Sequence, residues 1–150
     1  MIICALPEQS NEPGPGGSKR GRPTTQHTEF YMRKIFLACP YGHADKAVVE
    51  QRFDISNEVA ARIVRNGAVV FSQVSMSHPI NGHLAHLDKA AIGTLWAPVD
   101  AVFMDAMEEL IVIDEPGWKE SAGVAREIEF FRQRDRRVSL WSDAKSEFPA

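Results

Sequence analysis

The chain has 150 residues, of which 44% are hydrophobic and 25% are charged. That length and balance fit one globular domain with a hydrophobic core and exclude a chain that is disordered throughout. The formal net charge of −3 gives no general electrostatic attraction to nucleic acid or to an anionic membrane, so an anionic ligand would need a local site.

No apolar run approaches the roughly 18 residues that a membrane-spanning helix needs, and the N-terminus lacks the apolar stretch of a secretory signal. We therefore expect a cytoplasmic protein that does not contact membranes. The two cysteines, Cys4 and Cys39, lie in different settings, and they indicate no disulfide framework. Cys39, at the end of an apolar run, is interpreted as a small buried hydrophobe.

Residues 1–31 differ in composition from the rest of the chain, because they are rich in proline and glycine and contain a basic patch at 19–22. Such a segment cannot bury enough apolar area to offset the entropy lost on ordering. We predict a disordered tail over residues 1–31 and a folded domain over residues 32–150.

The first half of the domain is predicted to alternate strands and helices. A short apolar run at 34–39 predicts a buried strand. Apolar positions at helical spacing predict a helix over 44–66, which Gly67 ends, and Arg52 on this helix is interpreted as a surface ion. A second strand, too short and too β-branched for a helix, is predicted at 68–71.

The second half begins with a long stretch, 75–98, that we expect to form a loop and a short helix over the strand ends. A helix is predicted at 99–107 and a third strand at 109–114. The pattern then predicts a helix over 121–134 and a last strand over 137–141.

Strands separated by helices require crossover connections and therefore a parallel sheet. We predict an α/β fold, a small doubly wound sheet of the flavodoxin-like or Rossmann-like kind, with about five parallel strands and helices on both faces. Ligands of such sheets bind outside the carboxyl ends of the strands. Here that edge is formed by residues 39–43, 72–79 and 114–127.

The last of these segments joins a buried strand to a helix through small and polar residues. Ser121 is a natural N-cap, and Gly123 would let a phosphate or carboxylate approach the free N–H groups of the first turn. Glu127 shares a helix face with Gly123, because they are four residues apart. From the pattern alone, a surface acid near a helix start is the commoner case, and that alternative stays open.

Four stretches, taken in order, resemble the nucleoside 2-deoxyribosyltransferase superfamily, which also contains deoxynucleoside monophosphate N-glycosidases. They are Ile-Phe-Leu-Ala-Cys-Pro-Tyr at 35–41, Val-Val-Phe-Ser at 69–72, Glu-Glu-Leu-Ile-Val-Ile at 108–113 after Asp100, and Ser-Ala-Gly-Val-Ala-Arg-Glu at 121–127. The resemblance runs over residues 33–141 and is greatest to a bacterial branch of the superfamily.

This resemblance implies a hydrolase or transferase that cleaves the N-glycosidic bond of a nucleoside or nucleoside monophosphate through a covalent glycosyl-enzyme. It implies that Glu127 is the nucleophile and that Asp100 assists at the base or sugar, where an acid must protonate the departing base. It also implies that Ser121 and Gly123 hold a substrate phosphate or a neighbouring hydroxyl. No cofactor is implied.

The loop after the first strand departs from the family pattern. Phosphate-handling members carry an arginine and glycines there, whereas this chain has Pro40, Tyr41, Gly42 and His43. Tyr41 is expected to lie against the nucleotide, and His43 would replace the arginine only in part. Extra residues around Trp118 reshape the base pocket, where Trp118 would stack on the base or, alternatively, cap the core.

Three histidines, His78, His83 and His86, suggest a metal site, but their spacing matches no known zinc pattern, and we predict none. His78 is expected to line the pocket from the carboxyl end of the second strand. For His83 and His86, structural hydrogen bonding is the simpler interpretation.

Two alternatives remain open. One is a non-catalytic nucleotide-binding sensor or regulatory module of the same fold; the other is a flavin-binding flavodoxin-like protein, which the lack of a phosphate loop after the first strand disfavours. Because family members build active sites at subunit contacts, the resemblance implies a homo-oligomer, a dimer or tetramer, with residues 141–148 near the neighbouring subunit. The expected partners are a small nucleoside or nucleotide and further copies of the chain, without nucleic acid polymer or membrane.

Overall fold

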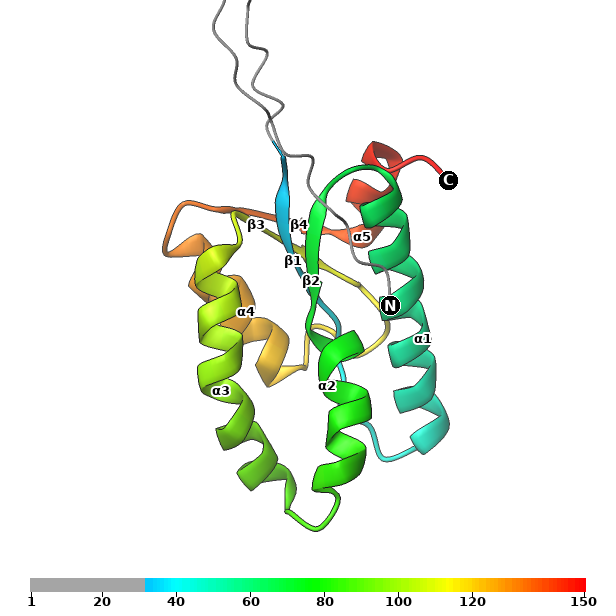
Figure 1. Ribbon diagram of the computed structural model, residues 1–150, viewed down its shortest axis with the longest axis vertical. Coiled ribbons are helices and arrows are strands. Elements are labelled where there is room, and N and C mark those ends of the chain that lie inside the picture. The colour runs from blue at the N-terminus through cyan, green and yellow to red at the C-terminus, as the bar shows by residue number, and fades with distance from the viewer. Residues whose placement is uncertain (1–31) are drawn as a thin grey trace, which may run out of the picture. The chain divides into compact units, whose positions relative to one another are not determined.

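The computed structural model describes residues 32–150, whose ribbon is shown in Figure 1. Four strands form one parallel sheet in the order β2-β1-β3-β4; they are β1 (Lys34–Ala38), β2 (Val69–Ser72), β3 (Glu109–Val112) and β4 (Arg137–Leu140). The predicted α/β fold is confirmed, with four strands where about five were expected. The predicted tail, residues 1–31, lies outside the described residues.

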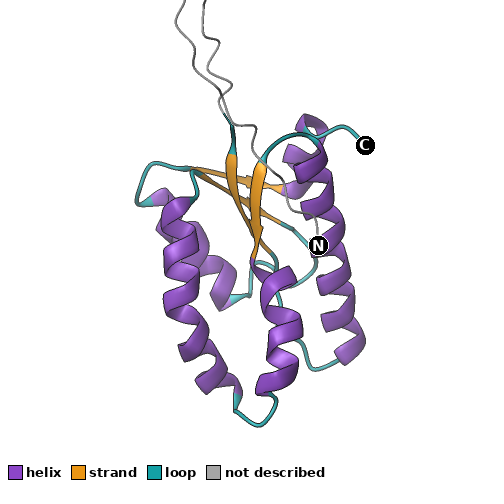
Figure 2. Ribbon diagram, viewed as in Figure 1, coloured by secondary structure: helices purple, strands orange, loops and turns teal. Residues whose placement is uncertain are grey.

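Helices connect the successive strands and cover both faces of the sheet (Figure 2). They are α1 (Lys46–Arg65), α2 (Gln73–Asn81), α3 (Lys89–Ala106), α4 (Ala122–Arg132) and α5 (Trp141–Ala144), with the 3-10 turns η1 (Gly82–Leu84) and η2 (Lys145–Glu147). One face packs on α1 and α5, and the other packs on α3 and α4 (Figure 1). This is the doubly wound arrangement that was predicted.

The central strand β1 is buried on both of its faces, as an inner strand of a parallel sheet should be. Because side chains alternate along a strand, Ile35 and Leu37 join the core beneath α1, and Phe36 joins the core beneath α4. The ring of Phe36 lies between two others, with centroids 5.4 Å from Phe71 and 6.0 Å from Phe131. Two separate apolar cores therefore hold the sheet in place.

Helix α1 begins after a capping residue and ends at the glycine that the sequence indicated. The side chain of Asp45 accepts a hydrogen bond from the N–H of Ala47 at 2.9 Å and so caps the first turn. The chain leaves the helix at Asn66 and Gly67. The φ of Gly67 is +80°, a left-handed backbone conformation that residues with a Cβ atom rarely adopt. The predicted helix over 44–66 is confirmed.

The prediction for residues 75–98 was wrong, because most of this segment is helical. Helix α2 and η1 occupy its first part, and α3 already begins at Lys89, where the Asp88 side chain accepts from the N–H of Ala91 at 2.8 Å. Pro79 and Pro98 lie inside α2 and α3. A proline removes one backbone hydrogen bond and bends a helix, but it does not have to end it.

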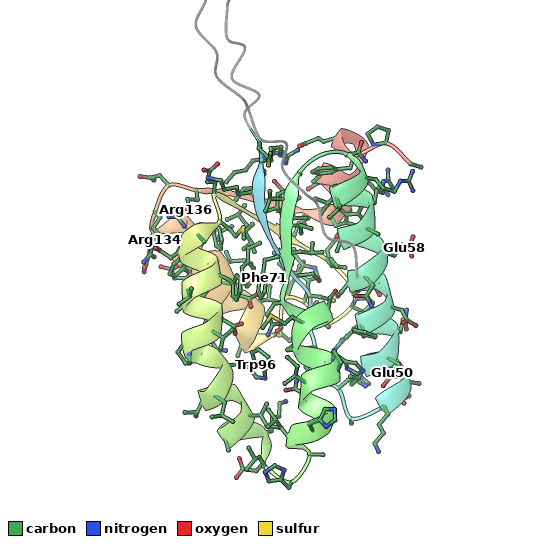
Figure 3. The ribbon with its side chains drawn as sticks, viewed as in Figure 1. Glu50, Glu58, Phe71, Trp96, Arg134 and Arg136 are labelled. Carbon is green, nitrogen blue, oxygen red and sulfur yellow. The ribbon has the colours of Figure 1, made fainter. Side chains whose placement is uncertain are left out.

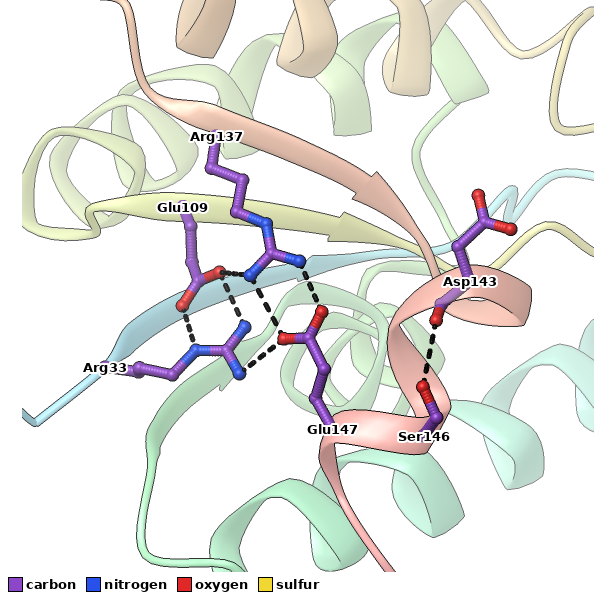
Figure 4. Close-up of polar contacts among 6 residues, drawn as sticks. All are labelled: Arg33, Glu109, Arg137, Asp143, Ser146 and Glu147. Carbon is purple, nitrogen blue, oxygen red and sulfur yellow. Dashed lines mark hydrogen bonds and ion pairs between the residues drawn. The ribbon is translucent and has the colours of Figure 1, made fainter.

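A cluster of ion pairs joins the amino ends of three strands to the C-terminal segment (Figure 4). Arg33 donates two hydrogen bonds to the buried carboxylate of Glu109, at 2.6 and 2.8 Å. The carboxylate of Glu147 pairs with Arg33 at 2.9 Å and with Arg137. These residues lie at the edge of the sheet opposite to the carboxyl ends of the strands.

The segment 141–148, which was expected near a neighbouring subunit, packs against its own domain. Ala144 and Phe148 belong to the core beneath α1, and Trp141 packs against it. The guanidinium of Arg62 also donates to the carbonyl oxygens of Lys145 and Phe148. The apolar side chains of this segment are therefore used within the chain.

Within residues 32–150, no helix has both the length and the apolar character that crossing a membrane requires.

Candidate functional site

A cavity of about 740 Å³ lies beyond the carboxyl ends of the strands. The chain passes from β1 to β2 on one side and from β2 back across β1 to β3, so the cavity adjoins the point where the winding direction changes. Doubly wound sheets bind their ligands at this point. Residues of the β1–α1 loop, α2, α3 and α4 form the wall, among them five predicted site residues: Tyr41, His43, Asp100, Gly123 and Glu127.

The start of α4 is built as the sequence indicated. Ser121 is the N-cap, and its hydroxyl accepts a hydrogen bond from the N–H of Val124 at 3.3 Å. Gly123 and Glu127 follow on one face of the helix, and both line the cavity. Ser121 itself is not among the lining residues, since its hydroxyl is used to cap the helix.

Glu127 is a buried carboxyl group inside the cavity, with 9% of its surface exposed. The pKa of Glu127 is raised from 4.5 to about 8, mainly by burial and also by the neighbouring charge of Asp100, while Arg126 acts in the opposite direction. The structure thus excludes the simplest alternative from the sequence, a solvated surface acid. Perturbed carboxyl groups in a cavity are typical of catalytic sites.

Asp100 reaches the same cavity from the middle of α3. Burial raises its pKa, although a hydrogen bond from the side chain of Gln73 and the charge of Arg126 lower it. Its Oδ1 atom is buried without a hydrogen-bond partner in the described part of the chain. Leaving a buried acceptor without a donor costs free energy of folding, unless a bound ligand supplies the donor.

Several lining residues were missed by sequence reasoning. Gln73, the first residue of α2, and Arg126, beside Glu127, both act on the charge of Asp100. Trp96 projects from α3 (Figure 3), and its indole N–H donates to Asn81 of α2 at 2.8 Å. Gln73 directly follows a strand and could have been identified from that position. Trp96 could not, because its place in the cavity wall depends on where α3 begins.

Two predicted residues lie behind Tyr41 instead of lining the cavity. Pro40 is fully buried beneath the loop, and the ring of His78 stacks on Phe53 with centroids 4.4 Å apart. The Tyr41 hydroxyl is 3.0 Å from Nδ1 of His78, and Nε2 of His78 is 3.3 Å from the carboxylate of Glu50. His78 therefore holds Tyr41 at the wall of the cavity.

Trp118 does not line the cavity either. It packs against the core beneath α4, and the ammonium of Lys119 lies 5.6 Å from the centre of its ring. Of the two interpretations that the sequence allowed, this position corresponds to a cap over the core.

Arg52, interpreted from the sequence as a surface ion, is buried with 6% exposed and joins the two loops beside the cavity. Its Nη1 donates to the carbonyls of Tyr41 and Gly42 at 3.4 and 3.1 Å, and its Nη2 donates to the carbonyl of Pro116 at 2.8 Å. Gly117 permits this contact, because its φ is +93° and an added Cβ would lie 3.1 Å from Nη2. The guanidinium thus fixes the β1–α1 loop relative to the β3–α4 loop.

Neither histidines nor cysteine form a second centre. His83 and His86 are exposed, and residues 32–150 contain no group of three or more side chains placed to hold a metal ion. Burial raises the pKa of the Cys39 thiol to about 11, as expected for a small buried side chain.

Among curated proteins, no sequence matches the chain at a significant level. Residues 33–143 match the family described as "Domain of unknown function (DUF1937)", and because that match covers well over half of the chain, the protein belongs to this family.

Proposed function

We propose that this protein cleaves the N-glycosidic bond of a nucleoside or a nucleoside monophosphate, with Glu127 as the nucleophile and Asp100 as the acid that protonates the departing base. The observation that carries the proposal is the pair of carboxyl groups, each with a raised pKa, in one cavity at the ligand-binding edge of the sheet. The resemblance of residues 33–141 to the nucleoside 2-deoxyribosyltransferase superfamily supplies the bond type.

The protonation of the pair suits this chemistry. The charge of each carboxylate would destabilise the other, so ionisation of both groups at once is disfavoured. In the empty cavity Glu127, whose pKa is about 8, holds a proton near neutral pH. Its transfer to Asp100 leaves an ionised nucleophile and a protonated acid, which are the two forms that the first step consumes.

The reaction then proceeds in two displacements. A carboxylate oxygen of Glu127 bonds to C1′ as the C1′–N bond breaks, and the bond's electrons leave on the base nitrogen, which takes the proton from Asp100. Water, or the nitrogen of a second base, next attacks C1′ and gives its proton to Asp100, and the bond to Glu127 breaks. Water gives hydrolysis, and a base gives transfer.

The rest of the cavity is compatible with such a substrate. Its volume of about 740 Å³ lies within the range usual for small-molecule sites. Trp96 and Phe130 offer apolar surface to a base, while Gln73 and the unpartnered Oδ1 of Asp100 offer polar atoms to a base edge or a sugar hydroxyl.

Release of free base tests the proposal. Purified protein is incubated with ribo- and deoxyribonucleosides and their 5′-monophosphates, and the products are separated by reversed-phase chromatography. We expect release from at least one substrate, with a loss of at least about 10³-fold in Glu127→Gln and a large loss in Asp100→Asn. Glu129→Gln is the matched control, because Glu129 lies exposed on the same helix outside this cavity. Equal activity of Glu127→Gln and Glu129→Gln would overturn the assignment.

A non-catalytic nucleotide-binding module is the second candidate, and the protonated state of Glu127 in the empty cavity favours it. Calorimetric binding of a nucleotide without base release from any substrate of the panel would establish it instead.

We also propose that the protein acts in the cytoplasm as a homo-oligomer, as the resemblance implies. Light scattering of the purified protein gives the mass in solution, and a monomer mass would contradict this part of the proposal.

A further inference from the structure

Tyr41, in the loop between β1 and α1, is held both by its backbone and by the tip of its side chain. Its carbonyl oxygen accepts a hydrogen bond from Nη1 of Arg52 at 3.4 Å, and its hydroxyl lies 3.0 Å from Nδ1 of His78. Tyr41 lines the cavity, whereas Arg52 and His78 do not. A side chain that is already fixed loses little further freedom when a ligand packs against it, so the ligand binds at a lower entropic cost.

Helix α1 fixes the orientation of His78. The ring of Phe53 stacks on the imidazole with centroids 4.4 Å apart, and the carboxylate of Glu50, labelled in Figure 3, lies 3.3 Å from Nε2. An ionised carboxylate can only accept hydrogen bonds, so the proton of the neutral imidazole belongs on Nε2. Nδ1 is then the acceptor, and the hydroxyl of Tyr41 donates to it.

Arg52 holds the backbone of the same loop and joins it to a second loop. Its Nη1 also donates to the carbonyl of Gly42 at 3.1 Å, and its Nη2 donates to the carbonyl of Pro116 at 2.8 Å. Pro116 lies in the loop that leads from β3 to α4, the helix that carries Glu127. One guanidinium thereby sets the separation between the loop of Tyr41 and the start of that helix.

The guanidinium of Arg52 is not the side chain that packing alone would favour at this position. Only 6% of Arg52 is exposed, and no carboxylate pairs with it in the described part of the chain. Burying a charge whose partners are neutral carbonyl groups is unfavourable compared with burying an apolar side chain of similar size. The charge is therefore better explained by the geometry that it imposes on two loops.

We propose that Arg52 and His78 are positioning residues of the site, which act on the substrate through Tyr41. The role of Tyr41 as a substrate contact rests on the proposed function, whereas its fixation rests on the contacts above. Because His78 contacts only the side chain of Tyr41, it should control affinity. Because Arg52 also holds the loop that leads to α4, it should control both affinity and the position of Glu127.

The two roles predict different kinetics for base release. A contact that is equally strong in the ground state and in the transition state affects KM alone, so His78→Leu should raise KM about fivefold and leave kcat unchanged. Arg52→Met should raise KM and also lower kcat at least about tenfold. His83→Leu and Arg65→Met are the matched controls, because both residues are exposed and lie outside the cavity, and they should change neither constant.

Dependence on the Tyr41 hydroxyl separates positioning from a general loss of structure. Tyr41→Phe should raise KM as much as His78→Leu does, and His78→Leu should have no further effect in the Tyr41→Phe background. His78→Asn, whose amide oxygen can replace Nδ1 as the acceptor, should restore part of the affinity. Additive effects of Tyr41→Phe and His78→Leu, or equal KM values for His78→Asn and His78→Leu, would overturn the role of His78.

Arg52→Lys is the second variant at the buried position. An ammonium keeps the charge but cannot reach the carbonyls of both loops in the fork geometry of a guanidinium. We expect Arg52→Lys to fold, as shown by circular dichroism, and still to lower kcat. A kcat equal to that of the wild type would show that the charge suffices, and it would overturn the role of Arg52 in spacing the loops.

The contact between His78 and Tyr41 can also be measured without turnover. NMR of isotope-labelled histidine reports which ring nitrogen of His78 carries the proton and how each nitrogen responds to Tyr41→Phe. We expect the proton on Nε2 and a shift of the Nδ1 signal in Tyr41→Phe. An Nδ1 signal that does not respond would mean that the hydroxyl does not donate to His78, and it would overturn the fixation of Tyr41.

The outcomes separate this inference from the proposed function. Base release that His78→Leu and Arg52→Met change no more than their controls do leaves the enzyme and overturns the positioning. If the wild type releases no base from any substrate, the enzyme is overturned. The NMR measurement then decides the inference alone, because a response of Nδ1 to Tyr41→Phe supports the fixation of Tyr41 and an unchanged signal contradicts it.

Discussion

The buried carboxyl of Glu127 should make the stability of this protein depend on pH in a way that one substitution removes. Its pKa is about 8 in the folded protein and 4.5 in the unfolded chain. Between these values the folded state retains a proton that the unfolded state has released, so stability is lost as pH rises through this window. Glu127→Gln has no such proton, and its stability relative to the wild type should therefore rise with pH.

The magnitude follows from the free energy of about 1.36 kcal/mol that each pH unit of pKa difference represents. From pH 4.5 to 7 the relative gain of Glu127→Gln should reach about 3 kcal/mol, and by pH 8 about 4 kcal/mol, above which it levels off. No large discount for solvent screening applies, because only 9% of the residue is exposed. The two pKa values, 4.5 and about 8, set an upper bound on this gain in stability, because water that enters the cavity would reduce the difference between them.

Urea unfolding at pH 5, 7 and 9, followed by circular dichroism, measures this difference. Glu129→Gln, on the exposed part of the same helix, is the matched control. If the difference in stability between Glu127→Gln and the wild type does not change with pH, the Glu127 carboxyl is solvated and the reasoning is refuted. The same titration should appear in catalysis, where kcat/KM for base release should fall as pH rises above about 8, because the carboxyl pair then loses the proton that Asp100 gives to the departing base.

Two other substitutions test the packing that positions the cavity. Glu109→Gln leaves Arg33 and Arg137 facing each other without their buried carboxylate, and we expect a loss of about 3 kcal/mol in urea unfolding. Lys34→Gln, in an ion pair with Glu108 whose side chains are 48% and 38% exposed, should cost less than about 1 kcal/mol. A similar small effect from both would show that the cluster is solvated. Gly117→Ala must adopt a φ near +93° and displace Arg52, so it should lose about 1–2 kcal/mol and weaken nucleotide binding by calorimetry. Gly82→Ala, at a helical φ with open space around it, should leave stability unchanged. Equal losses of stability in Gly117→Ala and Gly82→Ala would exclude the positive φ of Gly117 as the cause.

Much of the fold could be predicted because each local signal agreed with the others. The strand runs are short and mostly apolar, and Ser121 and Gly123 mark the start of α4. The spacing from Gly123 to Glu127 then places both in the cavity. Helix periodicity is a local property of the sequence, so once the start of a helix is predicted correctly, the residues that share its buried face are predicted as well.

Other features depend on contacts between distant segments. Arg52 belongs to the buried face of α1 with Ser56 and Val59, at spacings of four and seven residues. It was nevertheless interpreted as a surface residue, because arginine is usually exposed. The place of Trp96 in the cavity wall requires α3 to begin at Lys89, whereas a loop and a short helix were expected over residues 75–98. Trp118 turned to the core because the cavity wall is supplied instead by α2 and α3.

The ion pairs at the amino ends of the strands place residue 33 beside residue 147, on the far edge of the sheet from the cavity. A short linker could therefore join position 150 to position 33 in a circular permutant without crossing either face. New ends could then be opened in the exposed turn at Gly82, which would separate α2 from α3 while both stay in the chain. The link between two walls of the cavity could in this way be cut by a change in connectivity, with every side chain of residues 33–150 retained.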